Sequence, residues 1–100
     1  MKSILDLDFQ SYRHRVKEYL LNHILWAVGI FILSAWMSLS WFVYMAEKDV
    51  PGANILTYGD GIWWGIVTLL TIGYGDKYPI TTEGREFAGL LMVAGVMSVG

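Results

Sequence analysis

The chain has 100 residues, of which 55% are hydrophobic and 16% are charged, and its net charge is −2. A soluble domain of this size has too much surface to bury so many apolar side chains, so the composition favours a membrane or oligomeric protein. The weak negative charge argues against a nucleic-acid partner, and the lack of cysteine excludes disulfides and thiolate metal sites.

The N-terminal residues, 1–22, are predicted to form a cytoplasmic interfacial helix. Apolar side chains recur there at intervals of three and four: Phe9, Tyr12, Val16, Tyr19 and Leu20. The alternative is that these residues extend the following membrane helix without a break. Basic residues precede the first span at Arg13, Arg15 and Lys17, and only Lys48 closely follows it. This asymmetry predicts a cytoplasmic N-terminus.

An outer transmembrane helix is predicted at 23–46, because residues 24–46 carry no charge. As a helix this run would be about 34 Å long, enough to cross a bilayer. A cleaved signal peptide is a poorer interpretation, since a long polar segment precedes the run. Turn-forming residues then predict an extracellular turret loop at 47–61.

A pore helix is predicted at 62–70, where the apolar run reaches only about 14 Å and cannot span a bilayer. Asp60 is the expected N-cap. After an outer-mouth loop at 77–81, an inner transmembrane helix is predicted at 82–100, beginning at the Thr81-Thr82-Glu83 cap pattern. It stops without a basic anchor, and we expect it to be truncated.

Between these two helices lies a polar, glycine-rich segment, 71–76, here called the filter segment. Extended backbone at membrane depth is tolerated where its carbonyl oxygens line a pore and replace the water shell of a cation. Gly73 and Gly75 can adopt positive φ, which would direct successive carbonyls at one axis and leave Ile72 and Tyr74 pointing outward. The Thr71 hydroxyl would add a further oxygen ligand.

From Trp63-Trp64 through Thr71-Ile72-Gly73-Tyr74-Gly75-Asp76, the chain resembles the pore helix and signature filter of potassium channels, most closely the prokaryotic two-transmembrane channels. The resemblance continues through Tyr78-Pro79 and residues 92–95. It implies an all-α membrane protein with two transmembrane helices, a re-entrant pore helix and an extended selectivity filter, assembled as a tetramer. The implied function is passive, potassium-selective conduction, not enzymatic catalysis.

The resemblance also implies the roles of individual residues. Potassium ions would be coordinated by the carbonyls of Thr71, Ile72, Gly73 and Tyr74, with Gly75 at the outermost site. One chain supplies a quarter of each ring, so the expected unit is a homotetramer in a lipid bilayer. The filter would be supported by Trp63 and Trp64, with Tyr74 and Asp76 as hydrogen-bond partners, and Trp64→Phe is expected to preserve tetramers but to speed the loss of conduction.

Three further positions have alternative interpretations. Val67 departs from relatives that carry a Glu there, which puts inactivation through a carboxyl pair with Asp76 in doubt. Tyr78 matches an outer-mouth position at which four aromatic rings bind an external quaternary ammonium blocker. Gly95 matches the inner-helix gating hinge, whereas close helix packing is the commoner role of a membrane glycine and the one we favour for Gly100.

Other functions are weighed against this interpretation. A weakly selective cation pore usually lacks the filter Tyr or the second Gly, and both are present at Tyr74 and Gly75. A non-conducting membrane interaction subunit is the alternative from another class, and self-assembly would distinguish the two. We expect a multi-pass protein of the cell (inner) membrane, with a cytoplasmic regulatory domain possible beyond Gly100. The sequence predicts no bound ion other than potassium, no catalytic residues and no nucleic-acid site.

Overall fold

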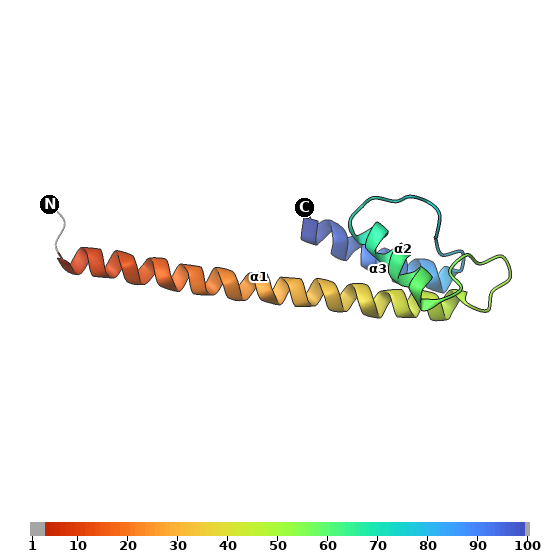
Figure 1. Cartoon of the computed structure of the whole chain (residues 1–100), viewed down its shortest axis with the longest axis horizontal. Helices are drawn as coiled ribbons and strands as arrows, with labels where there is room; N and C mark the ends of the chain where they lie inside the picture. Colours follow the sequence, from red (N-terminus) through yellow and green to blue (C-terminus); the bar gives the residue numbers. More distant parts are fainter. Residues whose placement is uncertain (1–3, 100) are drawn as a thin grey trace. The chain divides into compact units, whose positions relative to one another are not determined.

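The computed structural model describes residues 4–99, and it contains three α-helices there, α1 (Ile4–Glu47), α2 (Tyr58–Leu69) and α3 (Thr82–Val99) (Figure 1). No strand occurs among these residues, which confirms the all-α class for the described part of the chain. Gly100, the expected end of the inner helix, lies outside it. The chain divides into two compact units, Met1–Ile30 and Phe31–Gly100, and each is considered by itself.

The first unit is the N-terminal part of α1, and its described side chains are all exposed. They interact with neighbours one turn away: His14 with Glu18 (3.0 Å), Tyr19 with His23 (ring centroids 5.1 Å apart) and Arg13 with the Phe9 ring (5.8 Å). The helix has no break near residue 22, so the predicted boundary between 1–22 and 23–46 is wrong. No Gly or Pro interrupts residues 4–28, and the alternative of one continuous helix is the observed one.

Of the described helices, only α1 is long and apolar enough to cross a membrane. Little of its most apolar stretch is buried within the chain, unlike the core helix of a soluble protein. The 18-residue α3 carries Glu83, Arg85 and Glu86 in its first five residues. A second span is therefore not confirmed by length and composition.

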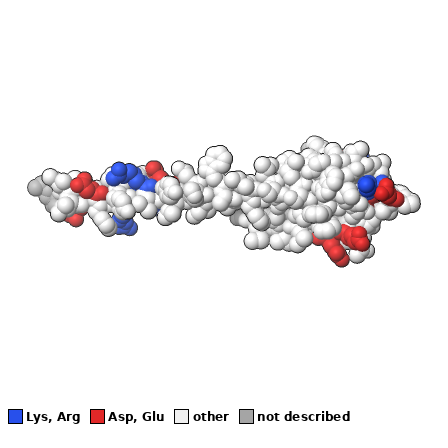
Figure 2. Space-filling model, turned by 90° about the horizontal axis from the view of Figure 1, so that it is seen from below, with Lys and Arg blue, Asp and Glu red and all other residues white. Residues whose placement is uncertain are grey.

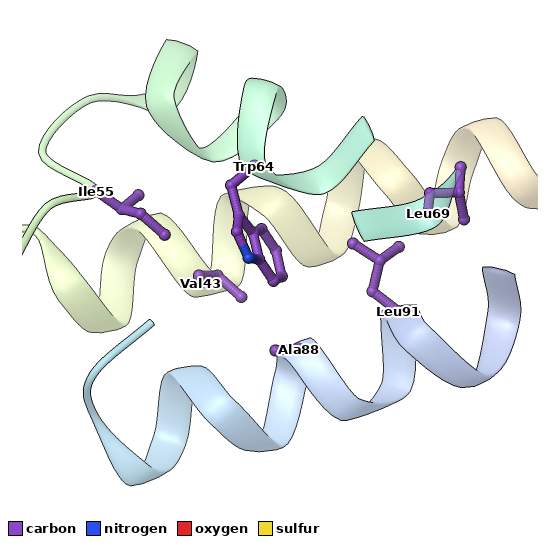
Figure 3. Packing of buried hydrophobic residues seen from close by; sticks show 6 residues of the cluster. All are labelled: Val43, Ile55, Trp64, Leu69, Ala88 and Leu91. Carbon is purple, nitrogen blue, oxygen red and sulfur yellow. The ribbon is translucent and has the colours of Figure 1, made fainter. Parts of the chain in front are cut away.

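The second unit packs α2 and α3 beside the C-terminal part of α1 (Figure 1). Its buried apolar cluster draws on all three helices and the turret loop: Val43, Ile55, Trp64, Leu69, Ala88 and Leu91 (Figure 3). The Trp64 ring points from α2 toward Val43 and Ala88. This cluster fixes the position of α2, and with it the start of the filter segment.

Two glycines allow α2 to approach α1 closely. A Cβ atom built at Gly61 would lie 2.9 Å from the Ser40 carbonyl oxygen, and one at Gly65 would lie 2.8 Å from Cδ1 of Trp36 and closer still to Ser40 Oγ. The Trp36 indole also donates a hydrogen bond to the Ile62 carbonyl (3.1 Å). Small residues one turn apart are a common means of close packing between membrane helices.

Helix α2 begins four residues earlier than predicted. Thr57, not Asp60, is its N-cap: the Thr57 hydroxyl accepts from the Asp60 N–H, while the Asp60 carboxylate accepts from the Thr57 N–H. This reciprocal capping box satisfies N–H groups that the first turn leaves unpaired, which is why the helix extends back into the expected loop. Helix α3 begins at Thr82, as predicted, and the Thr81 hydroxyl accepts from the Gly84 N–H (2.9 Å).

Much of the second unit's surface is apolar. On the face shown in Figure 2, its charged side chains gather toward one end and the rest is uncharged. Large exposed apolar side chains come from α1 and α3, and they include Trp41, Phe42, Met45, Leu90, Val93, Val96 and Met97. An apolar surface of this kind is typical of a chain that meets lipid or other chains.

Candidate pore-lining site

The filter segment is joined to the carboxyl end of α2 by backbone hydrogen bonds. These run from Thr71 N–H to the Thr68 carbonyl (3.0 Å), from Ile72 N–H to the Val67 carbonyl (2.9 Å) and from Gly73 N–H to the same carbonyl (3.3 Å). In a trans peptide the C=O points opposite to the next N–H. The carbonyls of Thr71 and Ile72 therefore point away from the Val67 carbonyl and the end of α2.

Three residues of this segment have positive φ. Gly73 (62°) and Gly75 (82°) adopt the conformation that the sequence predicts for them. Thr71 (60°) is a third, and it is the only non-glycine residue with positive φ in the described part of the chain. It occupies the left-handed position just after a helix end, where glycine is usual. No sequence pattern predicts this conformation at Thr71, because threonine rarely adopts it.

Little of the chain covers the filter segment. All six of its residues are exposed, with Ile72 at 49% and Tyr74 at 66%. Support comes from Trp63, whose ring stacks on Tyr74 (centroids 5.9 Å apart, 3° between planes) and whose indole N–H donates to the Asp76 carboxylate (2.8 Å). Trp64 is instead 4% exposed in the core. Of the two tryptophans, Trp63 contacts the filter segment within one chain.

Val67 supports the segment through its backbone. Its side chain is buried, and its carbonyl accepts the two hydrogen bonds from Ile72 and Gly73. The sequence singled out Val67 for the carboxyl group that it lacks. The structure adds a main-chain role that any residue in this position of α2 could perform.

The loop after the filter segment is held by residues of the turret loop and α2. Asn54 Oδ1 accepts from the Tyr78 N–H (2.7 Å), and the Lys77 ammonium donates to the Asn54 carbonyl (3.0 Å) and lies 3.7 Å from Asp60 Oδ1. The hydrogen bond from Leu56 N–H is the main cause that lowers the pKa of Asp60, and the charge of Lys77 adds to it. The Tyr78 ring is exposed. Sequence analysis missed Asn54 and Lys77, whose partners lie 17 to 24 residues away.

Glu47, at the end of α1, is fully buried. Its carboxylate accepts hydrogen bonds from the N–H groups of Ile80 and Thr81, the second at 3.3 Å, and so joins α1 to the start of α3. Acidic side chains are mostly exposed in proteins, so a surface position is the ordinary expectation for a glutamate at the start of the turret loop. Glu47 is instead an internal hydrogen-bond acceptor for backbone N–H groups. No local sequence pattern distinguishes an exposed acid from such an internal acceptor.

Gly95 lies on the buried side of α3, against the end of α2. A Cβ atom there would be 2.6 Å from the Leu69 carbonyl oxygen, so the position excludes any side chain. Within residues 4–99 no group of three or more Asp, Glu or His could hold a metal ion. The candidate cation ligands remain those that the sequence predicts, the filter-segment carbonyls and the Thr71 hydroxyl, which are uncharged oxygen atoms like the ligands of potassium filters.

Comparison with known proteins shows the family to which the chain belongs. Residues 31–100 match the family model described as "Ion channel". The chain is 42% identical over 80 residues to potassium voltage-gated channel subfamily KQT member 3 of Homo sapiens and of Bos taurus, covering 71% of this chain and 9% of each relative. It is 42% identical over 71 residues to KQT member 4 of Homo sapiens, covering 71% and 10%. The chain thus spans about a tenth of these relatives, and it belongs to the ion channel family.

Proposed function

We propose that four copies of this chain form a potassium-selective pore, with their filter segments arranged around one axis. The observation that carries the proposal is the backbone of residues 71–75. These residues follow the carboxyl end of α2 and are exposed. Gly73 and Gly75 have positive φ, and the carbonyls of Thr71 and Ile72 are directed away from the helix. The names of the KQT relatives, which are potassium channels, support the choice of ion.

Thr71 adds a second argument. A left-handed threonine costs free energy that glycine would avoid, and such outliers persist where the surroundings impose them, commonly at functional sites. The hydroxyl oxygen is what threonine offers and glycine lacks. In the proposed pore it joins the carbonyls of Thr71, Ile72, Gly73 and Tyr74 as a potassium ligand, and Gly75 contributes to the outermost site.

The geometry of one chain supports the proposed homotetramer. A single filter segment can present oxygens from one side only, whereas a dehydrated cation needs them all around. The exposed Ile72 and Tyr74 side chains and the apolar surface of α1 and α3 provide area for neighbouring copies. We place this assembly in the cell membrane with α3 as the inner helix and the N-terminus in the cytoplasm, consistent with Arg13, Arg15 and Lys17 preceding the apolar run.

Flux through liposomes tests the proposal. The purified chain is reconstituted, and rubidium uptake is driven by a potassium gradient, with sodium substitution and barium block as controls. We expect uptake that depends on potassium and stops with barium. Equal flux in sodium would indicate a non-selective pore, and absence of flux from verified tetramers would contradict the proposal.

A matched pair of variants locates the pore. Gly73 (φ 62°) and Gly52 (φ 85°) both have positive φ, and at both positions a Cβ atom would meet nothing within 4 Å of the same chain. An alanine therefore imposes similar backbone strain at either position. We expect Gly73→Ala to abolish selective rubidium uptake and Gly52→Ala to preserve it. Equal loss in both variants would show that general strain, not the filter, was responsible.

The exposed ring of Tyr78 gives the proposed outer mouth a pharmacological test. Four such rings would hold external tetraethylammonium by cation–π attraction. Tyr78→Phe keeps an aromatic ring and should retain the block, whereas Tyr78→Val should weaken it. The measurement is the concentration that halves rubidium flux, and equal values for Val and Phe would place Tyr78 away from the ion path.

A further inference from the structure

The residue that follows the filter segment, Lys77, carries a positive charge. In the proposed tetramer, four copies of this side chain would lie near the outer end of the ion path, next to Asp76. Like charges repel, and a ring of free ammonium groups would lower the concentration of potassium ions at the entrance. The position that the Lys77 ammonium takes therefore affects how easily cations enter.

The Lys77 ammonium is held by the turret loop and the first turn of α2. It donates a hydrogen bond to the Asn54 carbonyl (3.0 Å) and lies 3.7 Å from Oδ1 of Asp60. The side chains of Lys77 and Asp60 are 31% and 27% exposed. Asp76 and Tyr78, on either side of Lys77, are exposed. The charge of Lys77 is thus partly shielded from solvent, and salt screens such a pair less than a fully exposed one.

Both acceptors of the ammonium are fixed by other hydrogen bonds. Oδ2 of Asp60 accepts from two N–H groups just before α2, at 3.0 and 3.3 Å, which leaves Oδ1 for Lys77. The Asn54 side chain accepts from the Tyr78 N–H (2.7 Å), which ties the turret loop to the chain just beyond Lys77. An ammonium group that meets acceptors already in position loses less free energy to ordering them.

We propose that Asp60 and the Asn54 carbonyl keep the Lys77 ammonium beside the start of α2 and out of the ion path. The inference deepens the proposed function and rests on it. The opposite charges of Lys77 and Asp60 offset each other at short distance, and the negative charge of the exposed Asp76 remains. Four such carboxylates would raise the local concentration of cations at the entrance. Lys77 and Asp60 are thus positioning residues and do not bind the ion.

Single-channel currents in planar bilayers test this inference, because the current of one channel does not depend on how many channels fold. The variant Asp60→Asn keeps an oxygen for the N–H groups before α2 but removes the charge that pairs with Lys77. We expect inward current, in which ions enter through the outer mouth, to fall roughly threefold at about 10 mM salt, where the Debye length is about 30 Å. At about 1 M salt this length is about 3 Å, and the current should equal that of the wild type. Outward current should change less, because those ions leave through the outer mouth.

Lys77→Gln, made alone and together with Asp60→Asn, is the matched control. Alone it should change the low-salt inward current little, because the ammonium is already paired, and in the Asp60→Asn background it should restore the wild-type value. The same fold-change in both backgrounds would overturn the inference, as would an unchanged current in Asp60→Asn or a loss that persists at high salt. If Asp60→Asn forms no channels, Lys77→Gln alone decides, since a severalfold rise in inward current would place the ammonium in the ion path. Failure of the proposed function is recognised separately, because the wild type itself would then show no potassium-selective current.

Discussion

Helix α2 and the filter segment are adjacent in the chain but are stabilised differently. Trp64, Val67 and Leu69 of α2 are buried, and glycines let its backbone approach α1 closely. The filter segment is exposed along its whole length and contacts its own chain through Trp63 and the end of α2. The helix is thus fixed by packing within one chain. For the filter segment, contacts within the chain fix the start, at the end of α2, and Trp63 supports the far end, while the side chains stay exposed. The proposed neighbouring copies would have to complete it.

This comparison predicts that substitutions in the packed face of α2 act on folding, and that those beside the filter segment act on conduction. The largest effect is expected for Gly65→Val. Its side chain would overlap Ser40 and the Trp36 ring, which is held by its bond to the Ile62 carbonyl. Overpacking at rigid contacts costs typically 1–3 kcal/mol and occasionally more, so we expect about 3 kcal/mol and little recovered tetramer.

The control for this prediction is Gly59→Ala in the first turn of the same helix. A Cβ atom there would lie 3.6 Å from Thr57 Oγ1, an ordinary contact. Size-exclusion chromatography and thermal unfolding in detergent measure both variants. Similar profiles for the two would show that α2 does not depend on close approach to α1.

A smaller loss of stability is expected for Glu47→Ala. It would leave the partly buried N–H groups of Ile80 and Thr81 without their acceptor. An unsatisfied buried donor costs about 1–3 kcal/mol, and Glu47→Gln should lose less because an amide oxygen remains. Thermal unfolding checks the order, wild type above Gln above Ala. A glutamine variant as unstable as the alanine one would mean that the charge, not the acceptor, matters.

Trp63→Phe tests the other side of the comparison. It keeps the ring that stacks on Tyr74 but removes the indole N–H that donates to Asp76. The bond is exposed in one chain, so its loss should change the unfolding temperature little. The filter segment would lose a support, and we expect conduction to decay roughly tenfold faster, the change that about 1.4 kcal/mol produces. Trp64→Phe, in the core, should lower the unfolding temperature more. The reverse pattern in current decay and unfolding would overturn the assignment of Trp63 as the support.

The smallest effect is expected from the capping box of α2. The hydrogen bond from Leu56 N–H, followed by the charge of Lys77 and the capping-box bonds with Thr57, lowers the folded-state pKa of Asp60 below the ordinary value of 3.8. The stabilisation is therefore complete above that value and is lost as the pH falls through the folded pKa. Asp60→Ala should cost about 1 kcal/mol at pH 7. Unfolding temperatures of wild type and variant should converge only below about pH 4, and convergence at pH 6 would contradict the assigned shift.

The sequence was sufficient for features that depend on neighbouring residues. The apolar run of α1, the start of α3 after Thr81 and the positive φ of Gly73 and Gly75 were all predicted, because propensity, capping and glycine geometry are local properties. The boundary at residue 22 and the N-cap at Asp60 were wrong. In both cases the local signal was ambiguous. Helix α1 continues through residue 22 without a break, and the reciprocal hydrogen bonds with Asp60 make Thr57 the N-cap of α2.

The motif at residues 71–76, the apolar composition and the family were determined by the sequence itself, since they are carried by the identity and order of residues. Tertiary structure alone decided which tryptophan contacts the filter segment, that Glu47 is buried, and that Gly95 lies against Leu69. The contacts of Glu47 and Gly95 join positions 26 to 34 residues apart. Such partners are chosen by how the helices pack, which residue spacing along the chain does not encode.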